Sequence, residues 1–239
     1  TLGTLEADAN VIITAAGNTA ITNDAALALQ GAVTGTLAAT ATTGGITDSA
    51  NLSATGNVTL NDVATAGITL DTLEADANVI LTAAGNTAIT NDAALALQGT
   101  VTGTLAATAT TGGITDSSNL SASGNVTLND VATAGITLGT LEADANVILT
   151  AAGNTAITND AALALQGTVT GTLDATATTG GITDSSNLSA SGDVTLNDVA
   201  TAGITLGTLE ADANVIITAA ANPAITNDAA LALQGTVTG

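Results

Sequence analysis

The side chains of this chain that could do chemistry are carboxylates, hydroxyls and amides. Its 239 residues include 21 Asp and Glu but no Lys, Arg, His or Cys. One acidic pair, Glu6 and Asp8, returns further along as Glu74 and Asp76. Paired carboxylates are the catalytic groups of glycosidases. Because the pair returns in every copy of a repeat, we interpret it as structural.

Other kinds of catalysis need groups that the chain lacks. A Ser or Thr nucleophile requires a neighbouring base such as His or Lys, and no cationic side chain is available to stabilise an oxyanion. The absence of Cys excludes disulfides and thiolate metal sites. We therefore expect no enzymatic activity, and we expect neither catalytic, cofactor-binding nor metal-binding residues.

The formal charge of −21 limits the partners of the chain. Phosphates of a nucleic acid would be repelled, so we expect no nucleic-acid binding. No apolar run is long enough to form a membrane-spanning helix, so we expect no insertion into a membrane. The acids are best interpreted as a solvated surface that keeps the protein soluble.

Calcium bridging between carboxylates is the alternative interpretation of the acids. Its best local case is Asp71, which we expect to lie one turn from Asp92. Later copies carry Gly139 and Gly207 in place of Asp71, so such a site would be local.

A long sequence repeat positions all of these groups. The segment TLEADANVI begins at Thr4, Thr72, Thr140 and Thr208. The copies therefore span residues 4–71, 72–139 and 140–207, with a partial copy at 208–239. Self-similarity at a fixed period is typical of solenoids and arrays. We expect residues 1–239 to form one continuous segment, an excerpt of a longer repeat array.

Within each copy a weaker pattern predicts three turns of about 21–25 residues. A Leu is followed six residues later by a Val, as in Leu27 and Val33, and Ile-Thr pairs recur between these positions. Runs such as NVTLN and GITL are rich in β-branched residues and bounded by Gly, Asn and Asp. The pattern predicts an all-β parallel β-helix, a β-solenoid with three short strands per turn. The stretch at 34–45 is expected to be a surface loop or bulge.

This arrangement sets the expected spacing of the acids. With three turns per copy, equivalent carboxylates would share one row at intervals of about 14 Å. That distance exceeds the Debye length of roughly 8 Å at physiological salt, so their repulsion would be screened.

Two polar features leave further functions open. The Thr of the recurring Ile-Thr pairs should face outward, and rows of Thr on a β-solenoid could bind ice. The residues two positions after these Thr, Asp24, Ser49 and Asp71, are mixed. Sequons for N-glycosylation also occur in the chain, at Asn51, Asn57, Asn119, Asn125 and Asn187.

The alternation of LSATG and GNVTL (52–60) with AGITL (66–70) resembles the repeats of filamentous-haemagglutinin-like adhesins and other giant bacterial surface proteins. The resemblance implies a right-handed parallel β-helix, secretion through a dedicated outer-membrane route, and an extracellular location at the cell surface. We therefore expect a rigid spacer in a filament or adhesin stalk. The expected partner of the chain is the protein itself, which continues the stalk along its axis. The alternatives are a self-associating or calcium-bridged sheath and, more remotely, an ice-binding solenoid.

Overall fold

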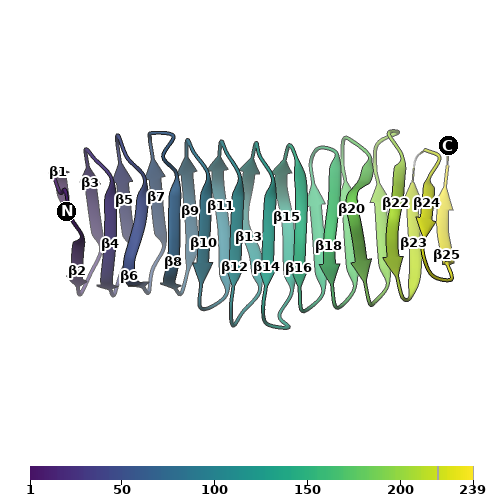
Figure 1. Ribbon diagram of the computed structural model, residues 1–239, viewed down its shortest axis with the longest axis horizontal. Coiled ribbons are helices and arrows are strands. Elements are labelled where there is room, and N and C mark those ends of the chain that lie inside the picture. The colour runs from purple at the N-terminus through teal and green to yellow at the C-terminus, as the bar shows by residue number, and fades with distance from the viewer. Residues whose placement is uncertain (220, 239) are drawn as a thin grey trace.

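A computed structural model describes residues 1–219 and 221–238, and in this part of the chain all regular structure is β-strand. None of these residues belongs to a helix long and apolar enough to cross a membrane. The strands form one sheet of 13 strands and one of 12. The two sheets face each other along one long axis, with the N- and C-termini at opposite ends (Figure 1).

The odd-numbered strands form the 13-stranded sheet, here called the odd sheet: β1 (Leu2–Leu5), β3 (Thr19–Asn23), β5 (Leu37–Ala41), β7 (Val58–Asp62), β9 (Asn78–Ala83), β11 (Leu95–Val101), β13 (Ile114–Ala122), β15 (Ile136–Ala143), β17 (Thr155–Asn159), β19 (Leu173–Ala177), β21 (Val194–Asp198), β23 (Asn214–Ala219) and β25 (Ala232–Val237). The even-numbered strands form the 12-stranded sheet, here called the even sheet: β2 (Val11–Ala15), β4 (Leu27–Val33), β6 (Ile46–Ala54), β8 (Ile68–Ala75), β10 (Thr87–Asn91), β12 (Leu105–Ala109), β14 (Val126–Asp130), β16 (Asn146–Ala151), β18 (Leu163–Val169), β20 (Ile182–Ala190), β22 (Ile204–Ala211) and β24 (Ala224–Asn227).

Each strand pairs in parallel with the strand two places later in sequence. One turn of the solenoid is therefore two strands and two corners, with one strand in each sheet. The spacing between paired residues varies from 18, between Val11 and Leu29, to 22, between Ile46 and Ile68. Because neighbouring strands lie about 4.8 Å apart, the rod is about 60 Å long.

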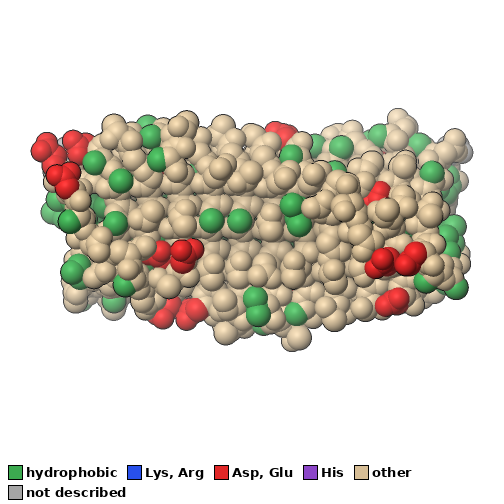
Figure 2. Space-filling view, in the orientation of Figure 1, with side chains coloured by type: hydrophobic (Ala, Val, Ile, Leu, Met, Phe, Trp, Pro, Cys, Tyr) green, Lys and Arg blue, Asp and Glu red, His purple; other side chains and the backbone are tan. Residues whose placement is uncertain are grey.

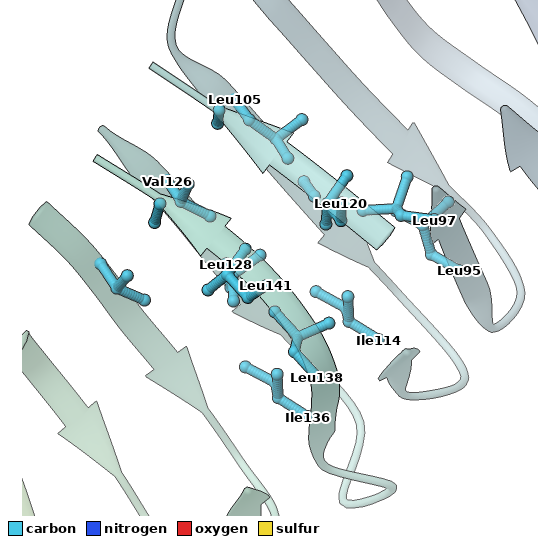
Figure 3. Packing of buried hydrophobic residues seen from close by; sticks show 14 of the residues in the cluster. Leu95, Leu97, Leu105, Ile114, Leu120, Val126, Leu128, Ile136, Leu138 and Leu141 are labelled. Carbon is cyan, nitrogen blue, oxygen red and sulfur yellow. The ribbon is translucent and has the colours of Figure 1, made fainter. Parts of the chain in front are cut away.

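The core lies between the two sheets and follows from alternation along each strand. In β14, for example, Val126, Leu128 and Asp130 are buried, whereas Thr127 and Asn129 face outward. Leu, Ile, Val and Ala fill the inward positions in one continuous cluster from Ile13 to Ala219. Figure 3 shows these aliphatic side chains meeting between successive strands.

The β-solenoid prediction is confirmed, but the predicted turn was too long. Turns average about 19 residues, and each has two strands where the sequence pattern had predicted three. The spacing of Leu and Val misled the prediction: Leu27 and Val33 share one strand, whereas Leu52 and Val58 lie on opposite sheets. Corners of two to five residues reverse the chain directly between the sheets, which leaves no room for a third strand.

One copy of the sequence repeat contains seven strands, so three turns per copy was also wrong. Equivalent strands of successive copies are β2, β9, β16 and β23. Seven strands make three and a half turns, and each copy therefore begins on the sheet opposite to the one before. Every surface feature of the repeat consequently appears alternately on the two faces of the rod.

The expected loop at 34–45 is also corrected. Its centre is β5, whose alternate residues Leu37, Ala39 and Ala41 are buried. The irregular segment lies elsewhere, in β6, where Leu29 pairs with Asp48 but Gly31 pairs with Leu52. Residues 49–51 therefore bulge out of the sheet.

Glycine is required where β11 approaches β9 most closely. Gly99 has φ of +112°, and a Cβ at this position would collide with the carbonyl oxygen of Leu81. Gly139 is an internal contrast, because its φ is not positive and a Cβ there would meet its nearest heavy atom, Oδ1 of Asp116, at 4.0 Å.

We expect Gly99→Ala to lower the free energy of unfolding by about 2 kcal/mol or more, through backbone strain and displacement of the paired strand. Gly139→Ala is the matched control and should change stability by less than about 1 kcal/mol. Urea denaturation followed by circular dichroism measures both. Equal effects of the two substitutions would contradict the close approach of β11 to β9.

Candidate functional site

The repeated acidic pair divides between a face and a corner of the rod. Glu74 faces outward from β8, whereas Asp76 lies exposed in the corner between β8 and β9. The expected row of equivalent acids is corrected by the seven-strand repeat. Glu74 and Glu142 lie on opposite sheets. The next equivalent residue on the sheet of Glu74 is Glu210, which lies seven strands further along that sheet, or about 34 Å away.

The acids consequently leave long stretches of each face uncharged. Figure 2 shows acidic side chains gathered in a few places on the face in view, with an extended surface free of them between. In that stretch of the even sheet, strands β10 to β18 present Ala, Thr, Asn, Ile and Gln outward.

A second recurring carboxylate binds backbone from the next turn. Asp184 accepts hydrogen bonds from the N–H of Gly207 (2.9 Å) and from the N–H and hydroxyl of Thr208 (2.5 and 2.9 Å). Burial alone would raise the pKa of Asp184, but these hydrogen bonds outweigh it and hold the pKa below its ordinary value. Asp48 and Asp116 make the same contacts in the earlier copies.

The proposed calcium pair does share one surface groove. Asp71 and Asp92 line it together with Glu74 and Asn51. The equivalent groove two copies later is lined by Gly207, Glu210 and Asp228, among others, so it lacks one carboxylate. Among the described residues, no three Asp or Glu lie in an arrangement suited to a metal ion.

The asparagine at the end of β10 is buried and fully hydrogen-bonded. Oδ1 of Asn91 accepts the N–H of Ala75 (2.7 Å), and its Nδ2 donates to the carbonyls of Ala75 (3.1 Å) and Ala94 (2.7 Å). This amide joins two successive turns through backbone groups that would otherwise be unpaired. Equivalent side chains at the ends of other strands are Asn23, Asn159 and Asn227.

A buried aspartate at the same inward position of other strands was missed by the sequence analysis. Asp62, Asp130 and Asp198 are each 1% exposed. Oδ2 of Asp62 accepts the N–H of Gly67 at 2.8 Å, but its Oδ1 is buried without a donor. The detectable signal was alternation, since in VTLND the Asp continues the inward series Val, Leu.

The sequons fall into two structural classes. Asn57 and Asn125 are acceptors for the N–H of Asn78 and Asn146, and Asp193 takes the same role in the third copy. The acceptor role explains why Asp can replace Asn there. The other sequons, Asn51, Asn119 and Asn187, are exposed at the end of the bulge.

The Thr residues that follow Ile do not form one continuous row. Thr47 pairs with Thr69, but the next partner of Thr69 is Ala88, and Thr22 lies on the other sheet. Asp24, Ser49 and Asp71 lie at a corner, on the bulge and beside the groove, and therefore do not form a second row.

Comparison with family models agrees with this periodic architecture. Residues 16–83, 84–152 and 152–208 each match a family described as repeats of unknown function (DUF5649). The chain belongs to the DUF5649 repeat family. The matched segments begin at the same interval as the sequence copies, and the first two each correspond to the length of one copy and to seven strands. No curated protein and no solved structure matches the chain.

We expect Asn91→Asp to destabilise this DUF5649 chain by about 3 kcal/mol, because a carboxylate cannot donate to the carbonyls of Ala75 and Ala94 and would be buried with its charge. Asn129→Asp makes the same chemical change at an outward position and should have an effect below about 0.5 kcal/mol. Thermal unfolding at pH 7 compares the two. Similar melting temperatures for both variants would show that the buried amide is not a stabilising contact.

We expect Asp184→Ala to lower stability by about 1–2 kcal/mol at neutral pH, since three donors lose their acceptor. The lowered pKa means that the contribution is present above the unfolded value of about 3.9 and is lost as the pH falls through the folded value. The difference from wild type should therefore shrink below about pH 4. Urea denaturation between pH 7 and pH 3 measures this difference, with Asp212→Ala as an exposed control. A difference that stays constant with pH would refute the assignment.

Proposed function

We propose that this chain is a rigid spacer in a secreted, cell-surface repetitive filament or adhesin stalk. The observation that carries the proposal is the continuity of the fold. Strands β3 to β23 each pair with a strand on both sides, and one aliphatic cluster runs through the whole stack.

Continuity of this kind favours stiffness. Bending the rod would separate paired strands along one edge and open the core between the sheets. Short corners contribute to the same effect, since they contain two to five residues and many of their backbone N–H groups donate to the preceding or following turn. A rod of this kind can hold a terminal group at a fixed distance without binding anything along its length.

The surface is consistent with service outside a cell. The chain has no Lys or Arg, so trypsin-like proteases have no cleavage site in it. Its acids are spread over both faces and the corners, which favours solubility and opposes lateral clumping.

Electron microscopy of chains with three, six and nine copies tests the proposal. We expect single straight rods whose length grows by about 17 Å per copy, with or without a calcium chelator. Strongly curved or collapsed particles would contradict a spacer. Lateral bundles that disperse when calcium is chelated would instead support the ion-bridged sheath, with the Asp71 groove as the first place to mutate.

The location is tested separately in the organism that makes the protein. Antibodies against the repeat should label intact cells, and external protease should remove that label. Labelling only after the cells are permeabilised would contradict a surface location while leaving the mechanical proposal intact.

A further inference from the structure

Three buried carboxyl groups stand out because no part of the spacer proposal uses them. Asp62, Asp130 and Asp198 end strands β7, β14 and β21, and each is followed by the corner Val-Ala-Thr-Ala-Gly. Each is the last residue of its strand and points inward. Strands β2, β3, β4 and β6 have Ala, Asn or Val at this position.

Each carboxyl group is only half satisfied. One oxygen of Asp130 accepts the N–H of Gly135 at 2.8 Å, as Asp62 does with Gly67 and Asp198 with Gly203. The other oxygen of each is buried and has no donor. The chain contains no Lys, Arg or His that could neutralise a charge here. An unpaired ionised carboxylate in such a place is costly, and the neutral form avoids that cost.

The surroundings of Asp62 are apolar or uncharged. The register places Asp62 between Ala41 and Ala83 of the adjacent turns. The corners of those turns, residues 42–45 and 84–86, contain no acid. Across the corner the chain resumes at Ile68, which pairs with Thr87. No titratable side chain therefore faces this carboxyl from the elements packed against it.

A second buried polar group without a partner lies one turn further on, directly after the next corner on that side of the rod. The hydroxyl of Thr87 is buried without a partner, and so is that of Thr155, the equivalent residue one turn after Asp130. The third copy has Pro223 at this position, so Asp198 has no such hydroxyl nearby. A shallow surface hollow lined by Asn61, Asp62 and Val63, among others, brings solvent close to the site.

We propose that Asp62 is an internal proton-binding site that couples the stability of the rod to pH. As the pH falls from neutral, its buried carboxyl takes up one proton in the folded chain before it would do so in the unfolded chain. The fold is then more stable in mildly acidic than in neutral solution.

The electrostatics of Asp62 agree with this assignment. Burial raises the pKa of Asp62, and the neighbouring backbone N–H groups, including the hydrogen bond from Gly67, lower it by less. A raised pKa in the folded state gives a penalty that is present above the folded value and disappears as the pH falls toward the unfolded value. This direction is opposite to that of Asp184, so the two kinds of site act in different pH ranges.

Carbon-13 NMR titration of the aspartate carboxyl groups tests the proposal directly. The variant D62N identifies the Asp62 resonance by its absence. In the wild-type protein this resonance should titrate at higher pH than the aspartate resonances of the urea-unfolded chain. Titration at the same pH as in the unfolded chain, or below it, would overturn the proposal.

Urea denaturation at pH 7 and pH 5 gives the energetic test. D62N is the buried-site variant, and the exposed-site variant D76N removes one charge in the same way. Wild type and this control should both gain stability on acidification, and the buried-site variant should gain clearly less. An equal gain in all three proteins would show that general charge repulsion alone produces the effect. If the buried-site variant does not fold, the titration of the wild-type protein decides.

Discussion

The structure depends on one constraint, the parallel pairing of each strand with the strand two places later in the chain. A single two-strand turn has few apolar side chains, and its backbone groups along both edges would be unpaired. Stacking supplies partners for the edges and joins the aliphatic side chains into one core. Polar side chains of the strands follow the same rule, since Asn91 and Asp184 both bind backbone of a neighbouring turn.

The odd number of strands in a copy has consequences for the surface. Because seven strands make three and a half turns, any residue of the repeat lies on alternate faces in successive copies. Equivalent carboxylates on one face are then about 34 Å apart. A repeat of six or eight strands would place them all on one face. The observed length therefore gives both faces the same pattern and halves the density of acid on each.

The fold class and much of the core were predictable from the sequence, whereas the turn was not. Parallel strands, inward Leu, Val and Ile, and the stacking of Ile46 on Ile68 follow from the repeat and its β-branched runs. The turn length depends on which residues form corners, and small residues such as Ala, Gly and Thr occur in strands and corners alike. The segment LAATA is strand β5 although its composition suggests a loop.

The buried carboxyl groups show a different limit of sequence reasoning. An Asp after a strand is usually a turn residue at the surface, and that general preference is the reason why Asp62 was overlooked. Only the register, which places Asp62 between two inward alanines, reveals that its side chain points into the rod. The Asn91 amide was hidden in the same way, because Asn is equally common at exposed turns.

Distances between spin labels would test the seven-strand copy most directly. The chain lacks Cys, so pairs of cysteines can be introduced at the exposed positions Thr82, Thr150 and Thr218 and labelled without side reactions. The structure predicts that labels at 82 and 218 lie on one face about 34 Å apart, and that labels at 82 and 150 lie on opposite faces, more than about 20 Å apart. A distance of about 14 Å between 82 and 150, with about 29 Å between 82 and 218, would mean three turns per copy and would contradict this account.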